Sequence, residues 1–182
     1  RRSSDLMVVN CMKGLHEEGI AACIKHFPGH GDTSGDSHKG YVETSKTWEE
    51  LLNCEMVTFK AAIKAGAPLI MTAHVSLPNV IGDKTPGTLS SLILTDKLRK
   101  ELGYKGIIIT DAMGMGAISQ HYDKARSAVL CLQAGADIVL MPEDLPLAFE
   151  AVVKAVEDGT LSEERIDESV RRVLALKQSL CG

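Results

Sequence analysis

The side chains best suited to chemistry gather in one short stretch of this 182-residue chain, residues 25–38, which reads KHFPGHGDTSGDSH. It combines three of the six histidines with a lysine, two aspartates and three glycines. It follows an apolar run at 20–24 that is typical of a short buried strand. Core packing calls for none of these residue types, whereas glycine-rich loops at strand ends often carry catalytic groups. We therefore interpret the stretch as a functional loop.

Within and beyond this loop, the residue types suit acid/base chemistry beside a fixed carboxylate. Asp36 could hold the tautomer of His38 and favour its imidazolium form, so that His38 serves as general acid and then as general base. Asp111 ends a β-branched run, which would hold its carboxylate in place as a nucleophile or an electrostatic stabiliser. Lys25 and His26 could donate hydrogen bonds to a polar substrate. This equipment suits glycoside hydrolysis, although most such enzymes use two carboxylates.

A metal centre is the competing interpretation of the same loop. Zinc or manganese could accept a ligand set drawn from four of its residues, namely His26, His30, Asp36 and His38. Pro28 and the glycines favour a loop that moves, which suits proton delivery better than a rigid metal cage. We predict no metal and no cofactor.

The rest of the chain alternates strands and helices four times. Apolar runs predict strands at 20–24, 68–73, 106–110 and 137–141, and helical spacing predicts helices at 5–18, 47–66, 90–102, 123–134, 146–157 and 162–179. A capping-box pattern, Thr47 to Glu50, opens the second helix. Short apolar strands separated by helices indicate a parallel sheet with helices outside it.

Polar residues follow the ends of successive predicted strands: Lys25 and His26, His74, Asp111, and Glu143 with Asp144. Strand ends of this kind meet at one face of a (β/α) barrel or in the crevice of an open doubly wound sheet. No GxGxxG follows the first strand, which favours the barrel. His74 is equally compatible with a core histidine bonded to backbone, Asp111 with a helix cap, and Met113 with packing.

A barrel of this type needs eight strands and about 250 residues. We therefore interpret residues 1–182 as one partial domain, the C-terminal half of a (β/α)8 TIM-type barrel with four parallel strand–helix units. Two open sheet edges would remain. Either an N-terminal half is missing from the sequence and associates with this one, or two copies assemble as a homo-oligomer.

Composition excludes several other classes of protein. The net charge is −4 and there is no basic block, so nothing favours nucleic-acid binding. No apolar run approaches the roughly 18 residues of a membrane span. The five cysteines form no CxxC pair, which favours reduced thiols and a reducing compartment. The chain begins at Arg1, so a targeting signal could precede it.

The long loop closely resembles the motif of glycoside hydrolase family 3 β-N-acetylglucosaminidases, bacterial exo-enzymes that act on peptidoglycan fragments. Further stretches resemble the family in the same order: MTAHV at 71–75, GIIITDAMGM at 106–115, AGADIVLMP at 134–142 and SEERIDESVRRVLALK at 162–177. The resemblance runs through nearly the whole chain.

The resemblance implies a (β/α)8 barrel and a retaining reaction on a carbohydrate. Asp111 would be the nucleophile that forms a covalent glycosyl-enzyme, and His38 the acid/base, partnered by Asp36. Lys25 and His26 would hold hydroxyl groups of the terminal N-acetylglucosamine, and His30 would order the loop. We also count His30, His74 and Met113 as candidate substrate-binding residues. The bacterial cytoplasm is favoured as the location, with an exported form left open.

The chain also departs from the family, because the early substrate-binding aspartate and arginines of the family's first half are not found here. We therefore expect weak or no activity from the 182 residues alone. Three alternatives stay open: a related β-glycosidase or a glycoside phosphorylase, a metal-dependent hydrolase, and a non-catalytic half-barrel. The phosphorylase is worth weighing because a neutral histidine would repel phosphate less than a carboxylate would.

Overall fold

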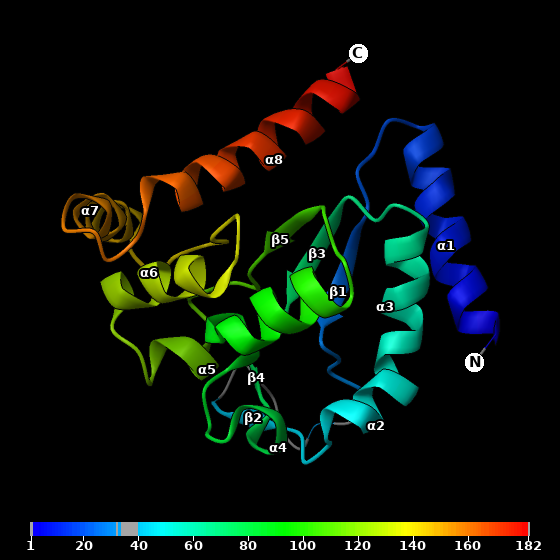
Figure 1. Ribbon diagram of the computed structural model, residues 1–182, viewed down its shortest axis with the longest axis horizontal. Helices are drawn as coiled ribbons and strands as arrows, with labels where there is room; N and C mark the ends of the chain where they lie inside the picture. The colour runs from blue at the N-terminus through cyan, green and yellow to red at the C-terminus, as the bar shows by residue number, and fades with distance from the viewer. Residues whose placement is uncertain (1, 32, 34–39, 182) are drawn as a thin grey trace.

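The computed structural model describes residues 2–31, 33 and 40–181 (Figure 1). Its helices are α1 Arg2–Glu17, α2 Trp48–Asn53, α3 Glu55–Lys64, α4 Pro78–Ile81, η1 Gly87–Leu89, η2 Leu92–Glu101, α5 Gly116–Ser119, α6 Lys124–Ala134, α7 Leu145–Glu157 and α8 Glu163–Cys181. Its strands are β1 Cys23–Phe27, β2 Val42–Glu43, β3 Leu69–Thr72, β4 Val75–Ser76 and β5 Ile107–Ile109.

The central sheet is parallel, in the order β1-β3-β5, as the strand–helix alternation predicts. Ile70 of β3 pairs with Ile24 on one side and Ile108 on the other, and both Ile70 and Ile108 are fully buried. A single parallel bridge, Ile109 to Ile138, extends the sheet beyond β5. Four chain segments therefore run in parallel, which agrees with part of a TIM-type barrel.

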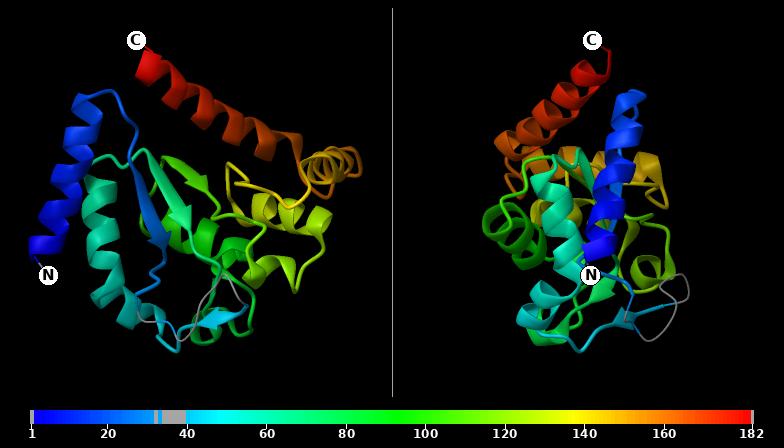
Figure 2. Two further views of the ribbon diagram at one scale, coloured as in Figure 1. Left: turned by 180° about the vertical axis from the view of Figure 1, so that it is seen from behind. Right: turned by 90° about the vertical axis from the view of Figure 1, so that its right-hand side faces the viewer.

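Helices surround the sheet unevenly. Figure 1 shows α1 and α3 side by side along the β1 edge, with α6 and α7 beyond β5. Helix α8 lies at the end where the central strands begin, while β2, β4 and α4 lie at the end where they finish; the view from behind in Figure 2 agrees. The two ends of the sheet therefore have different neighbours, and each can carry its own cluster of polar side chains.

The core joins the sheet to the flanking helices. The ring of Phe27, at the end of β1, meets Phe59 of α3 edge-on, with 5.3 Å between centroids. Leu98 of η2 and Tyr104 belong to the same cluster. Fully burying a side chain of this size stabilises the folded state by about 1.5–3 kcal/mol. The packing of Phe27 against Phe59 therefore holds the end of β1 in place.

The first strand lies three residues later than the prediction of 20–24. The backbone N–H groups of Gly19 and Ile20 donate to carbonyls of His16 and Leu15, which closes α1. Gly19 has a φ of 72°, a left-handed conformation that glycine adopts without penalty. Because Ile20 belongs to this helix cap, β1 starts at Cys23, and Lys25 and His26 lie in the strand rather than after it.

Four further features differ from prediction. The expected helix over 47–66 is two helices, because Cys54 leaves helical geometry at ψ −83°, although the predicted capping box of Thr47 and Glu50 is confirmed. The expected strand at 137–141 makes only one bridge, since the side chain of Thr110 accepts the N–H of Leu140 that a ladder would use. Helix η2 has π-type hydrogen bonding. The β2–β4 pair was not predicted.

Across the residues that the structure covers, none of the helices combines the length and apolar character that crossing a bilayer requires.

Candidate active site

The strand ends bring His26 and Asp111 together. Nε2 of His26, in β1, lies 3.6 Å from Oδ2 of Asp111, which follows β5. Both side chains are partly exposed, at 29% and 19%, so the pair is open to a ligand. Partial burial lowers the pKa of His26, and the carboxylate of Asp111 opposes that shift. A neutral imidazole is therefore the favoured state of His26 near pH 7.

The carboxylate of Asp111 is anchored to the backbone. Its Oδ1 accepts the N–H of Ala112 at 2.8 Å, while the carbonyl of Ala112 is held by Nε2 of His74 at 3.0 Å. Both the backbone N–H and the carbonyl of Ala112 are thus hydrogen-bonded to side chains. Because β5 ends at Ile109, the contact that holds the carboxylate is the one with the backbone of Ala112 rather than the strand itself.

His74 is a buried support of this arrangement. Its ring is 1% exposed and its Nδ1 lies 3.0 Å from the hydroxyl of Thr88, which in turn contacts Thr72 at 2.8 Å. Burial is the main reason that the pKa of His74 is lowered. Since a carbonyl can only accept, a neutral ring donates from Nε2 to Ala112. Its Nδ1 is then an acceptor beside the hydroxyl of Thr88, which also donates to the carbonyl of Ala73 at 3.0 Å. Both ring nitrogens are therefore engaged within the protein.

The start of the predicted catalytic loop lies directly against α3. Gly29 has a φ of 128°, and a Cβ added there would lie 2.5 Å from Cγ of Glu55. Glu55 accepts a hydrogen bond from Lys46 at 2.5 Å, so it cannot easily withdraw. Glycine is needed at this position for both conformation and space.

His30 turns back toward β1. Its ring centroid lies 6.0 Å from that of His26, in an edge-on arrangement. The hydroxyl of Thr33 lies 3.1 Å from Nδ1 of His30 and also 3.1 Å from its carbonyl oxygen. His26, His30 and Asp111 therefore form one cluster at the end of the sheet where the strands finish.

The other predicted site residues fall in different surroundings. Lys25 is exposed on β1. Met113 is 2% exposed and belongs to the hydrophobic core, with its N–H donated to the carbonyl of Leu140. Contact of Met113 or His74 with a sugar would require each to leave its present partners. Asp36 and His38 lie outside the described residues.

The metal alternative has no support in the part of the chain that the structure describes, where no group of three or more His, Cys, Asp or Glu could hold a metal ion. Asp36 and His38, which belong to the predicted ligand set, lie outside those residues.

Sequence reasoning missed Thr72 and Thr88. Thr72 stands in an apolar run, and a lone hydroxyl there is a signal that something must satisfy it. Thr88 lies in a turn-rich segment, and only the folded chain brings its hydroxyl to His74. A second missed cluster surrounds Asp137 at the opposite end of the sheet.

Comparison with known proteins gives likenesses over most of the chain. The sequence model described as glycosyl hydrolase family 3 N terminal domain matches residues 2–176. A β-N-acetylglucosaminidase structure of that family from Paenibacillus sp. str. FPU-7 superposes with a TM-score of 0.92 at 44% identity, over 95% of this chain and 34% of that one. A structure of the β-glucoside phosphorylase BglX gives a TM-score of 0.87 at 29% identity, over 92% and 32%.

A curated relative, β-hexosaminidase A of Pseudoalteromonas piscicida, is 33% identical over 93% of this chain and 32% of its own length. The present chain thus spans about a third of the length of that relative. The match of the family model to nearly every residue, together with these likenesses, places the protein: the chain belongs to glycosyl hydrolase family 3.

Proposed function

We propose that this chain carries the nucleophile and the acid/base loop of a retaining exo-glycosidase that releases terminal β-linked N-acetylglucosamine, with peptidoglycan fragments as the natural substrate. The observation that carries the proposal is the anchored carboxylate of Asp111 beside His26 at an open strand end. The names of the relatives support the choice of sugar, because they include β-hexosaminidase and β-N-acetylglucosaminidase.

The reaction proceeds in two steps. Asp111 attacks the anomeric carbon, while His38 protonates the oxygen of the departing group. His38, now neutral, takes a proton from water, which hydrolyses the glycosyl ester and frees Asp111 with overall retention of configuration. Asp36 holds His38 in the tautomer that these transfers need.

His26, His30 and Lys25 bind the hydroxyl groups of the sugar. The placement of His26 and His30 beside Asp111 favours this role. Lys25 is exposed on the same strand, and its charge acts on the pKa of His26. A neutral His26 can donate one hydrogen bond and accept another, which suits a hydroxyl. Gly29 lies directly against Glu55 at the start of the loop segment that leads to His38 in sequence.

A phosphorylase is the second candidate, and the likeness to β-glucoside phosphorylase BglX favours it. In that reaction phosphate, rather than water, attacks the glycosyl-enzyme. The neutral His38 of the second step would not repel the anion as a carboxylate would. Adding phosphate to the assay and looking for sugar 1-phosphate separates the two candidates.

The test uses a chimera in which residues 2–176 replace the matching segment of the Paenibacillus enzyme, compared with the 182-residue chain alone. The chimera should hydrolyse an aryl N-acetyl-β-glucosaminide. A fluorinated glycoside that traps the covalent intermediate should add its mass to the peptide containing Asp111. Asp111→Asn should lower kcat by on the order of 10³-fold or more and abolish the labelling.

The matched control is Asp167→Asn, because Asp167 is an exposed aspartate on α8 whose partner is Arg171. It should leave turnover and labelling unchanged. If the chimera folds, binds the substrate and labels at a different carboxylate, Asp111 is not the nucleophile.

A further inference from the structure

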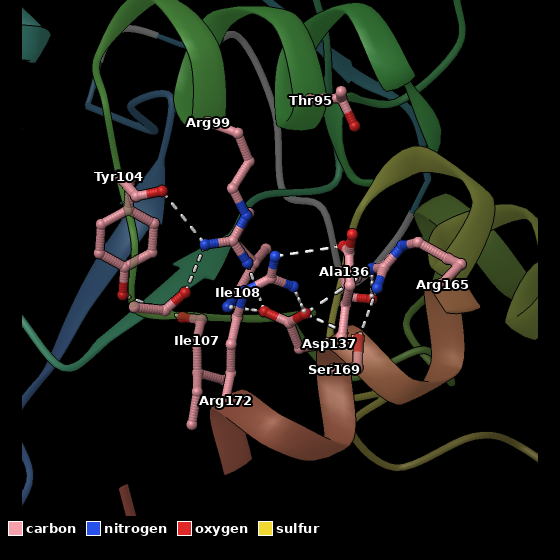
Figure 3. A network of polar contacts seen from close by, with 12 residues as sticks. Thr95, Arg99, Tyr104, Ile107, Ile108, Ala136, Asp137, Arg165, Ser169 and Arg172 are labelled. Carbon is pink, nitrogen blue, oxygen red and sulfur yellow. Dashed lines mark hydrogen bonds and ion pairs between the residues drawn. The ribbon is translucent and has the colours of Figure 1, made fainter. Parts of the chain in front are cut away.

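A second polar cluster lies against α8, at the end of the sheet where the strands begin, opposite His26 and Asp111. Figure 3 shows this cluster between η2 and α8. Its centre is Asp137, whose side chain has no exposed surface. The carboxylate accepts the N–H of Ile108 at 2.9 Å and the hydroxyl of Ser169 at 2.7 Å. It also faces three arginines: Arg99 of η2, and Arg165 and Arg172 of α8.

The cluster has more positive charge than its central carboxylate can neutralise. Arg172 lies 2.8 Å from Asp137 and pairs also with Glu168 at 3.3 Å, while Arg165 is 3.7 Å from Asp137. Burial lowers the pKa of Arg99 and Arg165, which means that the partly buried surroundings disfavour their positive charge. Both side chains nevertheless stay protonated, because arginine keeps its proton in proteins. An additional anion would relieve that penalty.

A hollow of about 400 Å³ opens beside these arginines. Its lining includes Arg99, Arg165 and Arg172 together with Lys100, Lys105 and Glu168. Five cationic side chains thus border the hollow, against three carboxylates in or beside it, Asp96 as the partner of Lys100, Asp137 and Glu168. Lys105 is exposed at the rim.

We propose that this hollow binds the phosphate group of a small phosphorylated molecule. The excess of two positive charges matches a phosphate monoester dianion better than a singly charged carboxylate. The terminal nitrogens of Arg99, Arg165 and Arg172 already bond Asp137, Glu168, Ser169 and backbone carbonyls, so these side chains contribute positive charge and only their remaining N–H groups. Lys105 adds a mobile ammonium group at an exposed position. The volume leaves room for a sugar-sized group attached to the phosphate. The site is independent of the glycosidase chemistry at the other end of the sheet.

Isothermal titration calorimetry of the 182-residue chain, at constant ionic strength, tests the proposal with inorganic phosphate and with glucose 6-phosphate. Saturable binding of at least one of them is expected, and the comparison tells free phosphate from a phosphate ester. Glucose should give no heat of binding. Lys105→Ala should weaken binding by roughly fivefold, the loss of one charged partner. The matched control Lys154→Ala, on the exposed side of α7, should not change it.

Phosphate at the candidate active site is a separate event, and His26→Ala distinguishes it. Binding that survives His26→Ala but weakens in Lys105→Ala and Lys100→Ala supports the hollow. Binding that is lost in His26→Ala and unchanged in both lysine variants overturns the proposal. So does a heat of titration no different from that of sodium chloride. Lys100 and Lys105 are exposed, so these variants should fold normally.

Discussion

Nε2 of His74 lies 3.0 Å from the carbonyl oxygen of Ala112, the residue directly after Asp111. The proposed nucleophile is thus supported by a histidine from a neighbouring strand end, through the backbone and not by side-chain contact. His74 is itself held by Thr88. The arrangement makes His74 a positioning residue, and it predicts effects on both stability and reactivity.

Replacing His74 should destabilise the fold. His74→Ala leaves the buried carbonyl of Ala112 and the hydroxyl of Thr88 without their ring partners and creates a cavity. The free energy of unfolding should fall by about 2–4 kcal/mol. Urea unfolding followed by the fluorescence of the single tryptophan, Trp48, would measure it. His16→Ala, at an exposed position of α1, should change the value by less than about 0.5 kcal/mol.

In the chimera, His74→Ala should also lower kcat more than it raises KM, because the carboxylate of Asp111 is less well held while the sugar contacts remain. Equal changes in kcat for His74→Ala and His16→Ala would contradict a positioning role.

Stability should fall as the pH drops below neutrality. The pKa values of His26 and His74 are both lowered in the folded protein, chiefly by burial. The unfolded chain, with histidine pKa values near 6.5, therefore binds more protons in the window below that value. The stabilisation is present above about pH 6.5 and is lost as the pH falls toward the folded-state pKa values. Urea midpoints at pH 7.5 and 5.5 measure the loss.

Carboxylates also titrate as the pH falls, so the informative quantity is the difference between variants. His74→Gln should show a smaller loss between pH 7.5 and 5.5 than the unmodified chain, because one buried histidine no longer has to be protonated. His16→Gln should keep the full loss. An unchanged loss in His74→Gln would show that this ring does not contribute to the pH dependence.

Much of the fold could be predicted from sequence patterns that depend on residues close together in the chain. The alternation of strands and helices predicted the parallel sheet, and Thr47 with Glu50 predicted a helix start, because both depend on neighbours in sequence. The position of β1 was wrong because Ile20 is apolar yet serves the cap of α1. The strand expected at 137–141 failed because a side chain, that of Thr110, replaced a backbone partner.

The candidate site was predictable where strand ends determine it. His26 and Asp111 were placed at one face because both follow or end parallel strands, and the structure brings them within 3.6 Å. The supporting contact of Thr88 could not be predicted, because it joins segments that are distant in sequence through side chains alone. The same holds for Asp137 and its arginines. The roles of Asp36 and His38 stay predictions.

The buried carboxylate of Asp137 should be a strong determinant of stability. Asp137→Ala leaves Arg99, Arg165 and Arg172 facing one another without their shared partner. Removing one member of a buried charge cluster costs about 3–5 kcal/mol, and urea unfolding would report it. Asp167→Ala removes an exposed carboxylate and should cost less than about 0.5 kcal/mol. Similar values for the two variants would contradict a structural role for Asp137.

Cys131 should resist thiol reagents in the folded chain. It is fully buried, and burial raises its pKa to about 12, so both access and thiolate are lacking at pH 8. Cys11 and Cys54 are exposed and should react first. Peptide mass spectrometry after timed labelling with iodoacetamide measures each rate, and labelling in urea shows that every thiol can react.

The rate at Cys131 then reports opening of the core. If labelling requires unfolding, Asp137→Ala should accelerate it at Cys131 by the same factor as it lowers the folding equilibrium constant, while Cys11 keeps its rate. A loss of about 3 kcal/mol corresponds to roughly 100-fold or more. Equal native rates at Cys131 and Cys11 would mean that the α6 side of the core opens without global unfolding, and that Asp137 does not control access to it.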